Sequence, residues 1–174
     1  MAAWTHIAHS ALSLPAATVT WTGISGSYDH LLIKISARSA ESDLEDWIQA
    51  TFNNDTASNY SQTYIYAASS TVYSSRGTSA FLDYWNCPSN TSLADTFGST
   101  EAWIPNYSNS ANFKQVFATS VFENNSTTNS EWKLKVGSCL LSATAAITEI
   151  DLVLGSGSDF MAYSTFDLYG ILGA

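Results

Sequence analysis

Three histidines, His6, His9 and His30, are the residues of this sequence best suited to binding a transition metal. The spacing of His6 and His9 would place both imidazoles on one face of a helix, where they could share an ion. Their segment has no helical periodicity, however, and no cysteine or carboxylate adjoins it. The acidic segments 43–46 and 53–55 also lack the spacing of a calcium-binding EF-hand loop. We therefore interpret the histidines as incidental and predict no metal site and no cofactor.

A pair of carboxylates, Asp83 and Glu101, is the best candidate for hydrolytic chemistry, because Tyr84, Trp85 and Trp103 are their neighbours in sequence. Glycoside hydrolysis needs two carboxyl groups that face each other across a cleft. Nearness in sequence does not establish such an arrangement, and no Gly-x-Ser-x-Gly nucleophile motif occurs. We interpret these residues as ordinary surface acids beside core aromatic residues, and we predict that the protein is not an enzyme.

Aromatic residues beside Asn and Ser in predicted loops favour a binding function. Tyr60, Tyr73, Tyr84, Trp85 and Tyr107 could stack on sugar rings while neighbouring amides and hydroxyls form hydrogen bonds. The same rings could instead complete the core, or anchor a subunit interface, where Tyr and Trp are enriched. The candidate partner-binding residues of this sequence are four of these rings together with one tryptophan near the N-terminus: Trp4, Tyr60, Tyr84, Trp85 and Tyr107.

The two cysteines, Cys87 and Cys139, permit one disulfide bond. Cys87 precedes a proline in a turn-like context, whereas Cys139 lies in an apolar stretch. The N-terminal residues have neither the basic region nor the apolar run of a secretory signal peptide. We therefore expect free thiols in a protein made in a reducing compartment.

Composition excludes several classes of protein. The chain has 174 residues, a length typical of one domain, and 13% of them are aromatic, so it can bury a core rather than remain disordered. Its six basic residues and net charge of −9 argue against a nucleic-acid partner. No apolar run reaches the ~20 residues of a membrane span, and the scarcity of strong helix formers argues against a helical bundle.

Alternation of apolar and polar residues is the strongest pattern in the chain and predicts β-strands. The spacing of eight to ten short strands predicts a single-domain, all-β antiparallel sandwich of jelly-roll type at residues 15–174, preceded by an N-terminal arm at residues 1–14. Residues 67–79 and 88–99 are predicted as long loops, and 155–158 as a hairpin. The clearest predicted strands lie at 31–38, 47–53, 113–122, 147–154 and 160–171, and weaker ones at 12–14, 18–21, 60–66 and 80–85.

Two of the patterns make more specific predictions. Residues 113–122 are nearly all apolar or small on both faces, as in a central strand. Around 132–136, Trp132, Leu134 and Val136 alternate with Lys133 and Lys135, which predicts a strand with one apolar side.

Four stretches, in the same order along nearly the whole chain, resemble a family of small structural proteins of tailed bacteriophages. They are Val19–Ile24 with Tyr28–Leu31 and Ala37–Ser39, the turn and Asn-Tyr-Ser motif at Phe52–Ser61, Ile104–Tyr107, and the ending Gly155–Phe160 with Ser164–Ile171. The Ser- and Tyr-rich segment 67–85 departs from the Gly-rich middle that is usual in the family. The resemblance implies a virion component with a compact β-sandwich, made in the bacterial cytoplasm and placed on the virion surface.

This resemblance leads to two functional hypotheses. The first is a head decoration (cement) protein that forms homotrimers and contacts the major capsid protein. Its N-terminal arm would dock on a partner through Trp4. The second is a module of the tail fibre or baseplate that contacts tail proteins and binds host surface glycans through the loops around Tyr60, Tyr84–Trp85 and Tyr107. Neither hypothesis involves a membrane.

Overall fold

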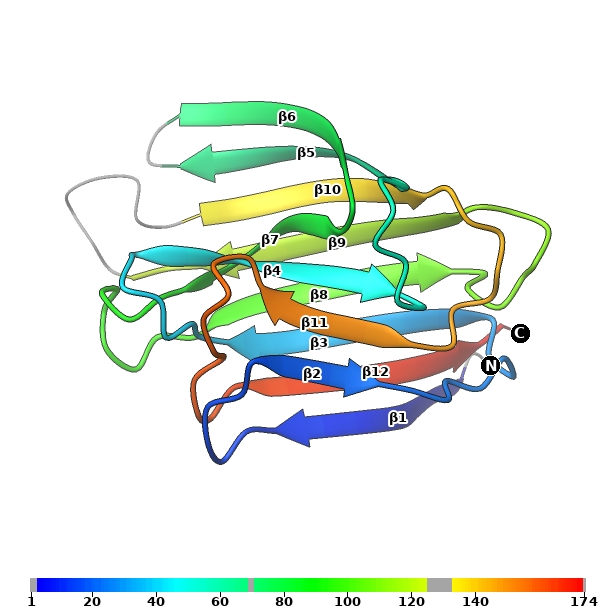
Figure 1. Cartoon of the computed structure of the whole chain (residues 1–174), viewed down its shortest axis with the longest axis horizontal. Helices are drawn as coiled ribbons and strands as arrows, with labels where there is room; N and C mark the ends of the chain where they lie inside the picture. Colours follow the sequence, from blue (N-terminus) through cyan, green and yellow to red (C-terminus); the bar gives the residue numbers. More distant parts are fainter. Residues whose placement is uncertain (1–2, 69–70, 125–132, 174) are drawn as a thin grey trace.

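The computed structural model describes residues 3–68, 71–124 and 133–173. Within them, twelve strands form two antiparallel sheets that pack face to face (Figure 1), which confirms the predicted all-β sandwich. No helix among these residues is long and apolar enough to cross a membrane. The larger sheet has the order β1 (Ala3–Ala11), β12 (Thr165–Leu172), β3 (His30–Ala37), β8 (Gly98–Pro105), β9 (Lys114–Phe122), β10 (Lys133–Leu141), β5 (Tyr60–Ala68) and β6 (Thr71–Ser79). The smaller sheet has the order β2 (Thr18–Trp21), β11 (Ile150–Leu154), β4 (Glu45–Phe52) and β7 (Leu82–Pro88).

The core lies between the two sheets and is built from alternate residues of most strands, as the sequence pattern predicts. In β4 the inward side chains are Ile48, Ala50 and Phe52, and all three are buried. β3 and β11 follow the same rule, with apolar side chains inward at every second position. The predicted turn after β4 is also confirmed, because Asn53 and Asn54 adopt positive φ angles of 55°, a conformation that asparagine tolerates.

The two sheets differ in width, and this decides which surfaces remain open. β7 is an edge strand of the smaller sheet. Figure 1 shows β5 and β6 extending beyond that edge, so the inner side of β6 has no sheet opposite it. The order of the strands also shows that β2, β3, β4 and β5 alternate between the sheets. The jelly-roll form stays a prediction.

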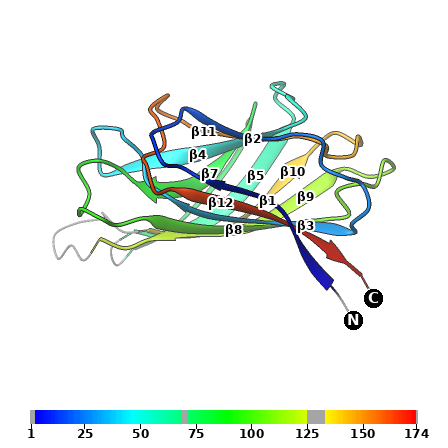
Figure 2. The ribbon, with the colours of Figure 1, turned by 90° about the horizontal axis from the view of Figure 1, so that it is seen from below.

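Residues 3–11 form β1, an edge strand paired with β12 along its whole length. The segment predicted as an arm is therefore part of the sheet over these residues. Figure 2 shows the start of β1 and the end of β12 extending together past the rest of the sandwich. Whether this projection docks on a partner stays a prediction.

Several local predictions are wrong. Residues 71–79 form strand β6, because their backbone pairs with β5 although their side chains are mostly polar. Segment 155–158 links β11 in one sheet to β12 in the other and is not a hairpin. No strand forms at 12–14. The predicted total of eight to ten strands falls short of the twelve observed.

Strands β9 and β10 differ from expectation in how their two faces are used. β9 is central, yet Phe117 and Val121 on its outer face are exposed. In β10 the side of Lys133 and Lys135 faces inward, and Leu134 is exposed on the outside. Trp132 lies outside the described residues. The register of β10 between β9 and β5 fixes this orientation, whatever the polarity of its side chains.

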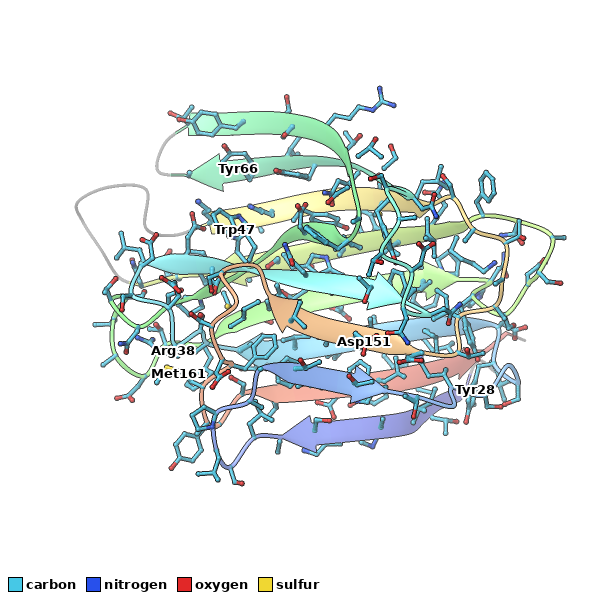
Figure 3. All side chains as sticks on the ribbon, in the orientation of Figure 1. Tyr28, Arg38, Trp47, Tyr66, Asp151 and Met161 are labelled. Atoms are coloured by element: carbon cyan, nitrogen blue, oxygen red, sulfur yellow. The ribbon has the colours of Figure 1, made fainter. Side chains whose placement is uncertain are left out.

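Two buried charged residues join the sheets to their loops. The Arg38 guanidinium (Figure 3) donates hydrogen bonds to the carbonyl oxygens of Leu93 and Thr96 at 2.7 and 2.9 Å, which holds the loop between β7 and β8. Asp46, the second residue of β4, is buried. Its carboxylate accepts hydrogen bonds from the hydroxyls of Ser39 and Ser156 at 2.8 and 2.6 Å.

Both cysteines are buried and unpaired, as predicted. Burial raises the pKa of the Cys139 thiol to about 12, and that of the Cys87 thiol well above its ordinary value. Neither thiol is ionised at neutral pH, so both act as small apolar residues of the core.

A close contact between Gly170 in β12 and the ring of Tyr28 gives the first testable prediction. A Cβ at Gly170 would overlap the ring atoms of Tyr28. Gly170→Ala should therefore lower the free energy of unfolding by about 1–3 kcal/mol, measured by urea denaturation. Gly77→Ala in β6 is the matched control, because nothing lies within 4 Å of the added methyl group. Equal stability of the two variants would contradict the prediction.

Candidate functional site

Four of the five predicted partner-binding residues belong to the core. Tyr60, Tyr84, Trp85 and Tyr107 are all fully buried, so their prediction as contact residues is wrong. Backbone carbonyls satisfy the tyrosine hydroxyls; the Tyr84 hydroxyl, for example, donates to Gly137 at 3.0 Å. Burial raises the pKa of Tyr60 to about 12. The fifth residue, Trp4, is 58% exposed and remains a candidate.

The acidic residues considered for catalysis do not face each other. Glu101 is exposed on the outer face of the larger sheet, where it lies 3.6 Å from the Lys34 ammonium. Asp83 lies on the other side of that sheet and pairs with the side-chain amide of Gln62. Partial burial raises the pKa of Asp83. These two carboxyl groups therefore do not form the cleft that glycoside hydrolysis needs.

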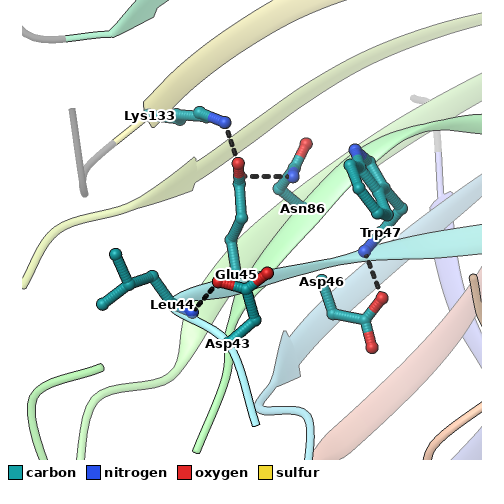
Figure 4. Close-up of polar contacts among 7 residues, drawn as sticks. All are labelled: Asp43, Leu44, Glu45, Asp46, Trp47, Asn86 and Lys133. Atoms are coloured by element: carbon teal, nitrogen blue, oxygen red, sulfur yellow. Dashed lines mark hydrogen bonds and ion pairs between the residues drawn. The ribbon is translucent and has the colours of Figure 1, made fainter. Parts of the chain in front are cut away.

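The segments considered for calcium use their oxygen atoms in contacts within the protein. The Asn53 side-chain oxygen accepts a hydrogen bond from the backbone N–H of Thr148 at 2.8 Å. Asp46 is bonded to two serine hydroxyls, and Glu45 forms an ion pair with Lys133 (Figure 4). These contacts hold the turn after β4 and the start of β4 in place.

The outer face of the larger sheet carries the most extensive exposed apolar surface among the described residues. Several strands contribute to it because the outward positions of neighbouring strands hold large apolar side chains in register. Trp103 in β8 lies opposite Phe117 in β9, and Val121 in β9 lies opposite Leu134 in β10. We call this surface the apolar outer face, defined by the exposed residues Trp4, Ile65, Val72, Phe117, Val121 and Leu134.

Two shallow grooves run into the apolar outer face. The first, of about 250 Å³, lies where Trp4 approaches Trp103 and Phe117 over the buried side chain of Leu32. The second, of about 170 Å³, lies between β10, β5 and β6, and its lining includes Ile65 and Val72. A protein partner that buried this face would find both a broad apolar area and recesses for its own side chains.

Charged residues on the described part of this outer face are few: three lie in a row across β12, β3 and β8, and Arg76 lies apart from them in β6. Lys34 in β3 lies opposite Glu101 in β8 and, on its other side, Asp167 in β12. The opposite charges of Lys34 and Glu101 partly cancel at 3.6 Å. The rest of the face therefore carries little charge despite the net charge of −9.

The inner side of β5 and β6, which the smaller sheet leaves uncovered, forms a second surface. Tyr66 (labelled in Figure 3) stacks on Tyr73 with ring centroids 4.9 Å apart, and Tyr64 stacks on the buried Tyr84 at 5.6 Å. Tyr73 at the outer end is 46% exposed. We call Tyr64, Tyr66 and Tyr73 the tyrosine shelf.

Two lysines of β10 face the tyrosine shelf. The Lys135 ammonium lies 5.2 and 5.4 Å from the ring centres of Tyr64 and Tyr66, which is cation–π distance. The Lys135 residue is only 4% exposed, and burial lowers the pKa of its ammonium to about 8. Lys133 is held by Glu45, whose other carboxylate oxygen accepts a hydrogen bond from the Asn86 amide at 2.7 Å (Figure 4).

Sequence reasoning named one residue of each surface, Trp4 and Tyr73, but it missed the two surfaces as a whole. The apolar outer face did leave a signal, because residues 113–122 are apolar on both sides. We interpreted that pattern as a strand buried on both faces, whereas its outer face is exposed. The tyrosine shelf left a weaker signal, the Tyr64, Tyr66 and Tyr73 spacing, which became visible only when residues 71–79 proved to be a strand paired with β5.

Comparisons with protein families, curated proteins and solved structures gave no match to this chain.

The environment of Lys135 gives a pH-dependent prediction. Its pKa falls from 10.5 to about 8 on folding, so between these pH values the unfolded chain binds more protons than the folded one. The stability of the wild type should therefore rise relative to that of Lys135→Met, by about 3 kcal/mol in total as the pH increases from 7 to 11. Below pH 8 both states hold the proton, and the cost of burying the charge is present in full.

Urea denaturation of both proteins across this pH range measures the effect. Tyrosines and cysteines that titrate in the same range are common to both proteins and cancel in the difference. A difference in stability that stays constant from pH 7 to 11 would show that the pKa of Lys135 is not lowered on folding.

Proposed function

We propose that this protein is a non-enzymatic structural component of a tailed-bacteriophage particle, most specifically a head decoration (cement) protein. The observation that carries the proposal is the apolar outer face. Soluble monomers rarely expose apolar patches of more than a few hundred Å², and larger ones mark interaction sites. The resemblance of the sequence to small phage structural proteins suggests that this surface binds other proteins of a phage particle.

The proposed mechanism is mechanical. Copies would associate through the apolar outer face, most simply as trimers around a local three-fold axis, and would bridge neighbouring capsid subunits. A standard protein interface buries about 1,600 Å² in total. Because this face carries few charges, its burial would leave few ionic groups without water. The net charge of −9 suits a protein on the outside of the shell, since it would not bind the packaged DNA.

Localisation on purified particles by electron cryo-microscopy tests this proposal. Hundreds of copies on the head are expected for a decoration protein. A few dozen copies or fewer, confined to the tail, would contradict the decoration role and favour a tail module. Absence from the particle would refute both structural roles.

Self-association gives a sharper prediction at the level of residues. Phe117→Ser combined with Val121→Ser should convert a trimer to monomers, and it should lower occupancy on the head at least about tenfold, because each lost apolar contact is worth about 1–3 kcal/mol. Light scattering after size exclusion gives the mass. The control is Trp47→Ser, because Trp47 is similarly exposed but lies on the smaller sheet. A wild-type protein that is monomeric at tens of µM would overturn the assignment of this face to self-association.

Glycan binding by a tail-associated protein is the second candidate function, and the tyrosine shelf is the observation that favours it. Sugar rings stack on exposed aromatic faces, and the stacked pair Tyr66 and Tyr73 offers such a platform at the edge of the sandwich. Of the rings first predicted to stack on sugars, only Tyr73 belongs to the shelf, because Tyr60, Tyr84, Trp85 and Tyr107 are buried.

A glycan array followed by titration tests the second candidate. Tyr73→Ala should weaken binding of any captured glycan about tenfold or more, since loss of stacking on one ring is worth about 1–2 kcal/mol. Tyr163→Ala is the control, because Tyr163 is also exposed but lies just before β12, away from the shelf. Equal loss in both variants, or no captured glycan, would count against the shelf as a sugar site.

A further inference from the structure

An irregularity in β1 places His6 and His9 on the same face of the strand. Residues three apart in a regular strand point to opposite faces. Here the register with β12 shifts between His6 and Ala8, so that one extra residue is accommodated in β1. A bulge of this kind restores the two imidazoles to one side. His6 then lies opposite Tyr169, and His9 lies opposite Asp167.

The two imidazoles converge on one carboxylate. The Asp167 Oδ1 atom lies 2.9 Å from Nε2 of His6 and 2.7 Å from Nδ1 of His9. One side-chain atom from each of the three residues can be chosen so that all three lie within 4.8 Å of one another. The ring of Tyr169 lies 5.0 Å from that of His6 and limits where this imidazole can turn. The group is therefore already gathered, although Asp167 is 161 and 158 residues from His6 and His9 in sequence.

We propose that His6, His9 and Asp167 form a binding site for a divalent transition-metal ion, with Zn²⁺ as the best match. Two imidazole nitrogens and one carboxylate oxygen are a ligand set typical of zinc and its neighbours in the first transition row. Magnesium and calcium prefer sites made of oxygen alone. The three side chains come from adjacent strands, and small rotations about their side-chain bonds bring the ligand atoms to the ~2 Å that such an ion needs.

Binding requires a change in how the imidazoles carry their protons. Without metal, each ring nitrogen next to Asp167 can donate its hydrogen to the carboxylate. With metal, the same nitrogen presents its lone pair to the ion, and the hydrogen is carried on the other ring nitrogen. The ion thus occupies the place of the two imidazole hydrogens that pointed at Asp167. The Asp167 carboxylate changes from a hydrogen-bond acceptor to a metal ligand.

Space for a further ligand lies beside this group. Asp167 also lines a polar depression of about 220 Å³, together with Lys34, Glu101 and Thr165. A zinc ion with three protein ligands keeps a fourth position for water or another small ligand, and the depression offers room for it. The histidines are largely exposed, so an ion can enter directly from solvent.

Titration of the whole protein with Zn²⁺ by calorimetry, and with Co²⁺ by visible absorption, tests the proposal. One equivalent of Zn²⁺ should bind, and Co²⁺ should give the visible bands of a low-symmetry site. His9→Gln and Asp167→Asn should each weaken binding at least about tenfold. His30→Gln is the control for a histidine outside the group, and it should bind like the wild type.

Spectra of the wild type provide a readout that does not depend on the folding of any variant. Bound Co²⁺ should shift or broaden the imidazole proton signals of His6 and His9 and spare those of His30. Absence of binding by the wild type would overturn the proposal and leave the group as a hydrogen-bonded link between β1 and β12. Undiminished binding by a folded His6→Gln/His9→Gln double variant would also overturn it.

Discussion

The packing of a four-stranded sheet against an eight-stranded one is the constraint on which the rest of this structure depends. Burial of apolar side chains stabilises only the strands that have a partner sheet opposite them. The core therefore lies against the covered part of the large sheet and includes Tyr60 of that sheet and Tyr84 and Trp85 of β7 in the smaller one. The parts beyond it, and its whole outer face, are left to interact with solvent or with other molecules.

Aromatic residues make the transition from core to surface gradual. Trp85 and Tyr84 are buried between the sheets, Tyr64 stacks on Tyr84, and the series continues through Tyr66 to the exposed Tyr73. A continuous series of rings keeps the uncovered part of β5 and β6 attached to the core. The same strands contribute Ile65 and Val72 to the opposite face. Because the shelf and the apolar outer face lie on opposite sides of these strands, occupation of one would leave the other free.

Sequence reasoning predicted most strands because their alternating pattern is local. It missed the sites because these join residues of strands that are far apart in sequence. The alternating patterns of residues 31–38, 47–53 and 147–154 indicated both the strand and its buried side, because each has a clear difference between its two faces. Residues 71–79 have no such difference, so only their pairing with β5 makes them a strand. His6 and His9 were dismissed as metal ligands because no carboxylate is near them in sequence. The structure shows that Asp167 of β12 provides this carboxylate.

The sequence by itself determined the all-β class, the free thiols, the positive-φ turn at Asn53–Asn54 and the inward positions of the regular strands. Each of these follows from local residue types and their period. Only the tertiary structure decided which apolar faces are covered, since this depends on the relative widths of the two sheets. It also decided that the candidate loop aromatics belong to the core. The joining of His6, His9 and Asp167 depends on the register of two strands from opposite ends of the chain, and no local pattern encodes that register.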